Sequence, residues 1–314
     1  MSDSWKPSTT VEMLHFRAHV IKKIRIFFEH LGVLEVETPL LMPNPVTDPY
    51  IETFKVDTLY GQGYLQSSPE YAMKRLLAAG SGSIYQLSKA FRNEEKSSKH
   101  NFEFSMLEWY RVGIDHHQLM DEIKSLMQML LPSIQFEMVT YGEIFEKFLG
   151  LNPHVEKLEA LQNLVKEKVG EIQGLDLVTR YHALELLFSY CIEPYLEKDL
   201  FYFIYHYTKE QSALARVIET DEGKVAARFE CFYQGLELAN GYYELTDEIE
   251  QKKRFDSDLE IRENEAKVLV PIDHNLLAAL KSGLPRCAGV ALGLDRLIMG
   301  LSDAESISHV VSFC

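Results

Sequence analysis

The stretch that most constrains this chain is FRNEEKSSKHNFEFSMLEWY, residues 91–110. An apolar run ends at Phe91, a polar loop rich in Lys and Ser follows, and a second run alternates from Phe104 onwards. Two half-buried strands around a basic loop are the pattern of a β-hairpin. The hairpin also carries charges of both signs, at Arg92, Glu94, His100, Glu103 and Glu108. Folding does not need them. They indicate a binding site, because a guanidinium suits a phosphate and carboxylates suit an amine or a metal.

Composition limits the classes of protein that fit. The 314 residues are 46% hydrophobic and 25% charged, which is ordinary for a soluble protein of one or two domains. No apolar run approaches the ~18 residues of a membrane-spanning helix. The first residues, MSDSWKPSTT, lack a secretory signal pattern. The four cysteines show no CxxC spacing, so we expect a reduced, cytoplasmic protein without a structural zinc site.

The net charge is −15, from 47 acidic and 32 basic residues. A protein that covers a nucleic-acid backbone needs clustered Lys and Arg, so this balance argues against an extended nucleic-acid surface. It favours a small-molecule or protein partner.

The N-terminal third predicts a helix, a strand and a second helix. Thr9-Thr10-Val11-Glu12 fits a capping box, apolar residues then recur at helical spacing, and Gly32 is placed to end the helix. Residues 33–41 alternate as a strand. Further on, a strand at Tyr64-Leu65-Gln66 runs into Ser67-Ser68-Pro69-Glu70, which reads as the start of a helix with Pro69 near its first turn.

The middle of the chain is mainly helical. Residues 116–131, 154–169 and 180–193 have apolar residues at helical spacing, whereas 201–207 is aromatic enough to be a strand. His116 and His117 do not share a helix face, so we interpret them as a solvated pair rather than a metal site.

Carboxylates recur in residues 227–255, where Glu230, Glu237 and Glu244 are seven residues apart. A helical face would give this spacing, but Gly235 and Asn240-Gly241 interrupt it and aromatic residues dominate. We predict two strands that meet near Gly235, followed by a turn at Asn240-Gly241.

Near the C-terminus, GVALGLDRLIMGL (289–301) predicts a strand–helix junction. Gly289 and Gly293 lie at this junction and Arg296 lies in the first helical turn. Small residues permit close approach of a flat ring, and the arginine can stack on it or reach phosphate.

These segments, in this order, resemble the three motifs of the class II aminoacyl-tRNA synthetases in their lysyl-tRNA synthetase form. Motif 1 corresponds to about 11–43, motif 2 (FRNE…HNPEFTMLEWY) to about 91–110, and motif 3 (GxGxGxDR) to about 289–301. The resemblance implies an α+β fold in which an antiparallel sheet is flanked by helices. It also implies a single catalytic domain over 1–314, a helical elaboration at about 111–195, and a homodimer formed through motif 1.

The resemblance further implies ATP as co-substrate, with Mg²⁺, and a role for each matching residue. Arg92 would hold the α-phosphate and Arg296 the γ-phosphate, and both would be catalytic. The implied ATP-binding residues are Arg92, Asn93, Glu94, His100, Asn101, Phe104, Glu237, Leu238, Gly293 and Arg296, and the implied metal ligands are Glu230 and Glu237. The implied substrate-binding residues are Ser68, Pro69, Glu70, Glu108, Tyr110, Asn240, Glu244 and Ala291, whose acidic members suit a doubly cationic, lysine-like substrate.

Two features depart from a true lysyl-tRNA synthetase. The motif 1 helix begins near Val11, which leaves no room for an N-terminal anticodon-binding OB-fold, and Ser68 and Ala291 replace a common Ala and the middle Gly of motif 3. Both features resemble the elongation factor P lysine ligases, a stand-alone family related to the lysyl-tRNA synthetase core. That family activates (R)-β-lysine, and lysine less well, and transfers it to a lysine ε-amine of elongation factor P. The resemblance therefore implies elongation factor P, rather than tRNA, as partner, and the composition indicates no membrane. We hypothesise that Ser68 and Ala291 help to select the β-amino isomer.

Two alternatives remain open. The chain could aminoacylate tRNA as a truncated lysyl-tRNA synthetase, against which the missing OB-fold and the net acidity count. It could also be a silent regulatory relative that only binds ligand, against which the intact Arg92, Glu237, Glu244 and Arg296 count.

Overall fold

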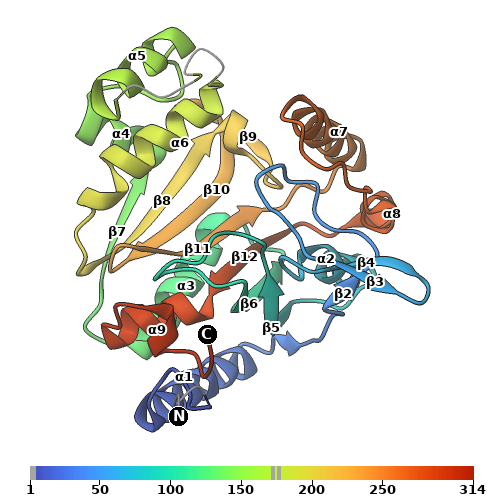
Figure 1. Ribbon diagram of the computed structural model, residues 1–314. Coiled ribbons are helices and arrows are strands. Elements are labelled where there is room, and N and C mark those ends of the chain that lie inside the picture. The colour runs from blue at the N-terminus through green and yellow to red at the C-terminus, as the bar shows by residue number, and fades with distance from the viewer. Residues whose placement is uncertain (1–4, 171–173, 175–177) are drawn as a thin grey trace. The chain divides into compact units, whose positions relative to one another are not determined.

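The structure is a computed structural model that describes residues 5–170, 174 and 178–314 (Figure 1). The chain divides into two compact units: unit 1 comprises Met1–Pro132 and Leu245–Cys314, and unit 2 comprises Ser133–Glu244. Unit 2 is therefore an insertion between two segments of unit 1. The predicted helical region at about 111–195 belongs partly to each unit, and its residues 171–173 and 175–177 lie outside the described residues.

The larger group of strands in unit 1 contains the predicted hairpin. Its order is β1 (Leu34–Glu35), β5 (Ile84–Phe91), β6 (Glu103–Val112) and β12 (Cys287–Gly293). β5 pairs antiparallel with β6 and β6 with β12, whereas β1 runs parallel to β5. A smaller antiparallel sheet has the order β2 (Leu41–Met42), β4 (Gly61–Leu65) and β3 (Lys55–Thr58). The hairpin of residues 91–110 is confirmed, with one correction: β6 is buried on both faces from Ser105 to Tyr110, so it is not half-buried.

Helices accompany these strands in unit 1. They are α1 (Val11–His30), α2 (Glu70–Ala78), α3 (His116–Leu130), α7 (Glu248–Asn264), α8 (His274–Gly283), α9 (Leu294–Ser302) and the short η4 (Ile307–His309). α1 buries Val20, Ile24 and Phe28, and the Phe28 ring stacks on Tyr85 of β5 at 4.3 Å between centroids. This aromatic contact fixes α1 against the motif 2 hairpin, since buried aromatic pairs add to the stability gained from burial.

The motif 1 segment agrees with the sequence prediction only in part. The helix is confirmed and ends before Gly32, whose φ of +65° is the left-handed conformation typical of a helix C-terminus. The helix begins at Val11, as predicted, but its N-cap is Thr10, which accepts the Met13 N–H bond, so Thr9 and Glu12 do not form the predicted capping box. The single strand over 33–41 is wrong. β1 and β2 belong to different sheets, and Pro39 between them has no N–H to donate to a ladder.

Unit 2 has its own strands and helices. Its strands have the order β11 (Leu236–Tyr243), β10 (Gly223–Tyr233), β8 (Leu200–Thr208) and β7 (Gln135–Thr140), with β9 (Val217–Thr220) paired to β10. Its helices are α4 (Tyr141–Leu149), α5 (Leu158–Lys168), α6 (Arg180–Cys191), η2 (Glu193–Tyr195) and η3 (Lys209–Gln211). α4 and α6 contribute Tyr141, Phe145 and Phe188 to a core that includes Tyr207 of β8 and Phe232 of β10. The helices predicted at 154–169 and 180–193 are confirmed as α5 and α6, the helix predicted at 116–131 as α3 of unit 1, and the strand at 201–207 as β8. The strands β7 and β9 were not predicted.

The predicted turn at Asn240-Gly241 is wrong. β10 and β11 turn at Gln234 and Gly235, both with positive φ, and Asn240 and Gly241 lie inside β11 opposite Glu230 and Phe229. A Cβ at position 241 would collide with the Phe229 ring. The glycine therefore serves close packing across the ladder rather than a turn.

Two further observations concern the cysteines and the helices within the described residues. Cys191, Cys231, Cys287 and Cys314 are all free thiols. No described helix combines the length and the apolar character needed to cross a membrane.

Candidate active site

In unit 1 the motif 2 loop and the motif 3 helix form a cluster of cationic side chains. Arg296, in the first turn of α9, donates from Nη2 to Nε2 of His100 at 2.5 Å and from Nε to the Lys99 carbonyl at 3.4 Å. Arg92, at the end of β5, lies with its guanidinium carbon 5.4 Å from the Phe104 ring centroid. Its Nε is buried without a hydrogen-bond partner in the described structure. Two guanidiniums near one imidazole, one of them with an unused donor, make a site for a polyanion.

His100 is held neutral in this cluster. Burial lowers its pKa, and the positive charges of Arg296, Arg92 and Lys99 lower it further. A neutral imidazole can accept the Arg296 hydrogen bond, whereas an imidazolium would repel it. His100 therefore orients Arg296 without adding a charge of its own.

The other residues predicted to bind ATP in unit 1 surround this cluster. Phe104 is half-buried on β6, Glu94 is half-buried in the loop, and Asn93 is exposed. Asn101 donates from Nδ2 to the Glu103 carbonyl at 3.2 Å. Gly293 is the N-cap of α9, and a Cβ there would have only ordinary contacts with Arg296.

Three more predicted site residues lie on the neighbouring strands β6 and β12 of unit 1. Glu108 of β6, 1% exposed, lies opposite Ala291 of β12 and opposite Gln86 of β5. Tyr110 donates its hydroxyl to Glu108 Oε1 at 2.7 Å. The structure thus brings Glu108, Tyr110 and Ala291 together as the sequence implied. Gln86 was missed, although a polar residue inside an apolar strand was the available signal.

The predicted substrate-binding residues Ser68, Pro69 and Glu70 lie at the start of α2. Pro69 is the N-cap of α2, and the Glu70 N–H donates to Ser68 Oγ at 3.4 Å. Glu70 Oε1 accepts from Lys74 Nζ at 2.7 Å, and Lys74 is almost fully buried. Lys74 was not predicted, although its place four residues after Glu70 is the spacing of a helical ion pair.

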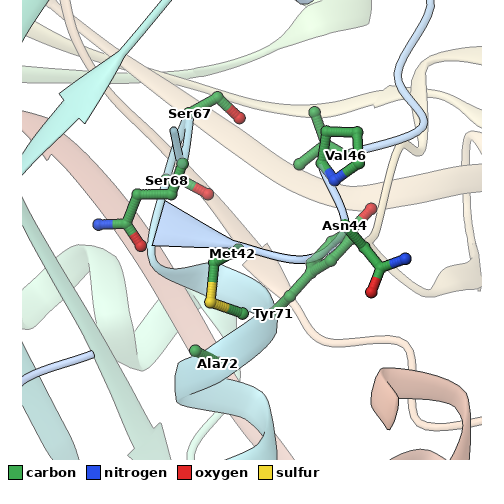
Figure 2. Close-up of a pocket in the computed structure, with 9 residues that line it drawn as sticks. Met42, Asn44, Val46, Ser67, Ser68, Tyr71 and Ala72 are labelled. Carbon is green, nitrogen blue, oxygen red and sulfur yellow. The ribbon is translucent and has the colours of Figure 1, made fainter. Parts of the chain in front are cut away.

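A small pocket, partly open to solvent and here called the cavity, adjoins this segment (Figure 2). Ser67 and Ser68 lie on one side of it and Asn44 and Val46 on the other (Figure 2). The cavity is also lined by Met42, Pro45, Gln66, Tyr71 and Ala72. Unit 1 therefore offers space beside predicted substrate contacts as well as a cationic cluster.

Unit 2 holds the remaining predicted residues on β10 and β11. Glu230 and Asn240 are cross-strand partners, as are Phe232 and Glu237, so Glu230, Glu237 and Asn240 share one face. Glu244, two positions beyond Tyr242, is buried at the end of the same strand, and Leu238 is buried at the bulge. The four carboxylate and amide side chains are thus brought together within this unit.

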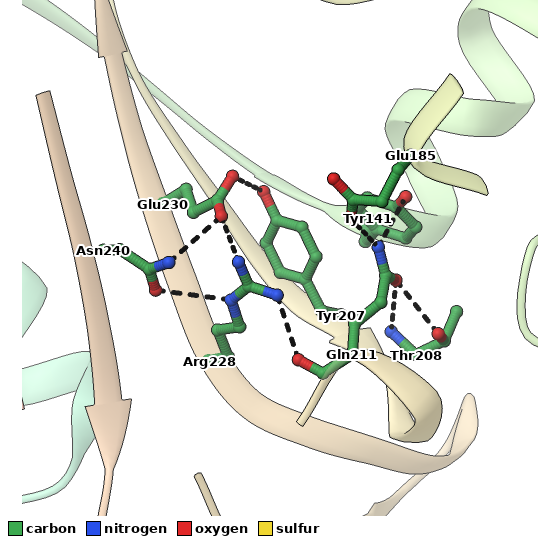
Figure 3. Close-up of polar contacts among 8 residues, drawn as sticks. All are labelled: Tyr141, Glu185, Tyr207, Thr208, Gln211, Arg228, Glu230 and Asn240. Carbon is green, nitrogen blue, oxygen red and sulfur yellow. Dashed lines mark hydrogen bonds and ion pairs between the residues drawn. The ribbon is translucent and has the colours of Figure 1, made fainter. Parts of the chain in front are cut away.

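Arg228 organises this face and was missed by the sequence analysis (Figure 3). It donates to Glu230, to Asn240 Oδ1 at 3.3 Å and to the Gln211 carbonyl at 2.9 Å, and lies 4.6 Å from the Tyr207 ring centroid. Glu230 also accepts from Tyr207 at 2.7 Å and from Asn240 Nδ2 at 3.2 Å. The contacts fix which way the Asn240 amide points.

Burial raises the pKa of Glu230, and the charge of Glu237 raises it further, whereas Arg228 lowers it. A cation bound between these two carboxylates would relieve their repulsion. Oxygen ligands suit Mg²⁺, and a carboxylate has about four lone-pair positions, so the three hydrogen bonds to Glu230 leave room for coordination. The residues fit the implied metal.

The sequence matches the family of tRNA synthetases class II (D, K and N) over residues 4–314. The chain belongs to this family. Its relatives include the elongation factor P–(R)-β-lysine ligases of Pseudoalteromonas translucida (strain TAC 125), 46% identical over 98% of this chain and 97% of the relative, and of Yersinia enterocolitica, 45% identical over 99% and 97%. The ligase of Vibrio cholerae is 44% identical over 99% of this chain and 98% of the relative. The predicted resemblance and fold class are confirmed, and the class II family implies the use of ATP.

An ion pair between Arg17 and Asp295 connects the three segments that resemble motifs 1, 2 and 3. Asp295 of motif 3 is 1% exposed, contacts Arg17 of motif 1 at 2.6 Å and accepts from the Ser105 N–H of motif 2 at 2.7 Å. Arg17 also donates to Ser105 Oγ at 2.8 Å. Neither Arg17 nor Asp295 was predicted to have a role.

The interpretation of the two adjacent histidines is wrong for one of them. His116 is 2% exposed and its ring lies 4.1 Å from that of His117, so the pair is not solvated. The two residues are the first of α3, and the planes of their rings are tilted by 39°.

We expect the carboxyl group of Asp258 on α7 to make the free energy of unfolding depend on pH. It accepts from Thr47 Oγ1 at 2.6 Å, and burial raises its pKa from 3.8 to about 6. The folded state therefore binds this proton more tightly than the unfolded state, and the contribution is present below about pH 4 and lost as the pH rises through about 6. We expect Asp258→Asn to exceed the wild type in stability at about pH 8, by up to roughly 3 kcal/mol, and the gap to close towards about pH 4.

Urea unfolding across this pH range measures the gap. Asp256→Asn, an exposed position on the same helix, is the control and should show no such trend. A gap for Asp258→Asn that stays constant with pH would mean that Asp258 does not titrate differently on folding.

Proposed function

We propose that the protein activates (R)-β-lysine, and lysine less well, with ATP and transfers the acyl group to a lysine ε-amine of elongation factor P. The observation that carries the activation step is the hydrogen bond between Arg296 and His100, whose pKa is lowered by burial and by the charges of Arg296 and Arg92. The acceptor is inferred from relatives at 44–46% identity that are named elongation factor P–(R)-β-lysine ligases.

In the first step the substrate carboxylate attacks the α-phosphorus of ATP, and pyrophosphate leaves. The guanidinium of Arg92 binds the α-phosphate, Arg296 binds the γ-phosphate, and Phe104 stacks on the adenine. Asn93, Glu94, Asn101 and Gly293, with Glu237 and Leu238, complete the proposed nucleotide contacts. Mg²⁺, when held by Glu230 and Glu237, supplies positive charge to the phosphates. These side chains align the reactants and stabilise charge on the phosphoryl oxygens, so no nucleophilic side chain is needed.

In the second step the acceptor ε-amine attacks the acyl carbon of the adenylate, an amide forms, and AMP and a proton leave. The dicationic substrate is bound by carboxylates. Glu108 with Tyr110, and Glu70 beside Ser68 and Pro69, serve this role in unit 1, as Asn240 and Glu244 do in unit 2. Ala291, opposite Glu108, favours the β-amino isomer. Pyrophosphate exchange that compares β-lysine with lysine in Ala291→Gly tests that role, and an unchanged preference excludes it.

We further propose a cytoplasmic homodimer formed through motif 1. Exposed apolar side chains there include Ile26, Leu31 and Leu34. A second candidate, aminoacylation of tRNA, uses the same activation chemistry with another acceptor, but the net charge of −15 disfavours an RNA surface.

The deciding experiment is a competition for the acyl group. The protein is supplied with ATP, Mg²⁺ and labelled (R)-β-lysine, and elongation factor P and lysine tRNA are offered together. We expect the label on elongation factor P, in an acid- and base-stable amide. Label on the tRNA would establish the second candidate, and a protein that also fails in pyrophosphate exchange with either amino acid would be a silent relative.

A further inference from the structure

One buried arginine of α7 contacts a loop more than 200 positions away in the sequence. Arg262 is 1% exposed, and a guanidinium has five N–H donors. Four of its contacts are backbone carbonyls: Thr47 at 2.9 Å, Asp48 at 2.6 Å, Ile51 at 3.0 Å and Val268 at 3.1 Å. The remaining contact is an ion pair with Glu52 at 3.5 Å. Every donor of this guanidinium therefore has a partner, and most partners lie in residues 44–52, here called the 44–52 segment.

Two other side chains hold the same segment from the same region of the chain. Asp258, one turn before Arg262 on α7, accepts from Thr47 Oγ1 at 2.6 Å. Lys267 donates to the Pro49 carbonyl at 2.8 Å and lies 4.7 Å from the Tyr50 ring centroid. The 44–52 segment has no helix or strand of its own, so these contacts replace a regular hydrogen-bond ladder.

The 44–52 segment lies between two parts of the proposed active site. At its start, Asn44 and Val46 line the cavity opposite Ser67 and Ser68 (Figure 2). At its end, the Glu52 carbonyl accepts from the Asn93 N–H at 2.8 Å, directly beside Arg92. A shift of this segment would move one wall of the cavity and one attachment of the motif 2 loop.

We propose that Arg262 is a positioning residue for amino-acid activation, which fixes the 44–52 segment between the cavity and motif 2. The proposal rests on the proposed function for its kinetic consequence, whereas its structural consequence does not. A lysine at this position keeps the charge but has three donors on one atom, so it cannot reach carbonyls spread around a planar fork. Arg262→Lys therefore separates the role of the fork from the role of the charge.

The test compares Arg262→Lys with Arg254→Lys in pyrophosphate exchange. Arg254, on the same helix, pairs with Glu250 through Nε at 3.2 Å, an ion pair that an ammonium can also form. We expect Arg262→Lys to raise the KM for the amino acid and to lower kcat, with kcat/KM down about tenfold or more. We expect Arg254→Lys to match the wild type. Free guanidinium ion, but not NaCl at equal ionic strength, should restore part of the activity of Arg262→Ala, which a general loss of stability would not allow.

Hydrogen exchange gives a readout independent of function. In Arg262→Lys the amides of residues 50–51 and of Asn93 should exchange faster than in Arg254→Lys, at temperatures where both remain folded. Equal exchange and equal kinetics in the two variants would overturn the proposal. If the wild type shows no pyrophosphate exchange, the proposed function fails and hydrogen exchange alone decides the positioning role. Should Arg262→Lys not fold, Thr47→Val removes the hydrogen bonds of the Thr47 hydroxyl with Asp258 and Tyr71, leaves the Thr47 carbonyl in place, and must raise the KM in the same direction.

Discussion

Replacing Arg92 with alanine should lower amino-acid-dependent pyrophosphate exchange by about 10²–10³-fold, with most of the loss in kcat. The reason is that Arg92 has a buried Nε without a partner in the described structure and a guanidinium close to Phe104 and His100. Its charge is placed for a phosphate rather than for a protein carboxylate. Negative charge on the α-phosphoryl oxygens grows as the substrate carboxylate attacks, so the donor acts most strongly in the transition state. Steady-state exchange with saturating ATP and (R)-β-lysine measures the loss.

Arg92→Lys separates charge from shape in the same assay. An ammonium retains attraction for phosphate but not the two parallel donors, so we expect activity between that of the wild type and Arg92→Ala. Lys252→Ala, an exposed position on α7, is the control and should retain full exchange. If Arg92→Ala kept its kcat and only the KM for ATP rose, the guanidinium would contribute ground-state binding alone.

Much of the fold could be predicted because the local signals agree with the tertiary structure. The α1 helix, the motif 2 hairpin and the β12–α9 junction each have a clear apolar period and a terminating residue. The wrong predictions have a common physical cause. The same short sequence can form a turn or part of a strand, and its tertiary contacts decide which. Asn240-Gly241 has the composition of a turn, but Gly241 is needed where the Phe229 ring crosses the neighbouring strand.

Some charged residues could be assigned a role from the sequence, whereas the role of others is visible only in the structure. Residues expected to contact substrate, such as Arg92, Glu108 and Arg296, could be named because their segments resemble the synthetase motifs and carry more charge than folding needs. Residues that hold other parts of each unit in place, such as Arg228 in unit 2 and Arg262 in unit 1, sit in sequence contexts where a charged residue normally faces solvent. Only the structure shows that both are buried among backbone carbonyls and carboxylates. Sequence periodicity carries no information about a partner that lies two hundred residues away.

Asp295→Ala should be the most destabilising of the proposed single substitutions in unit 1, at about 3–5 kcal/mol. The substitution leaves the guanidinium of Arg17, whose side chain is 15% exposed, without its carboxylate, and it leaves the Ser105 N–H without its acceptor. Removing one partner of a buried pair costs more than the pair contributes, because the remaining charge cannot return to water. Urea unfolding measures the change in free energy.

The double variant Arg17→Met/Asp295→Leu distinguishes this explanation from a loss of packing. With both charges gone no ion remains buried alone, so the double variant should recover much of the stability lost in Asp295→Ala. Asp256→Ala, which breaks the exposed Lys252–Asp256 pair, should cost no more than about 0.5 kcal/mol. If the double variant were as unstable as Asp295→Ala, the cost would lie in the lost Ser105 contact, since the leucine and the methionine restore volume. The ion pair would then not be what holds the three motifs together.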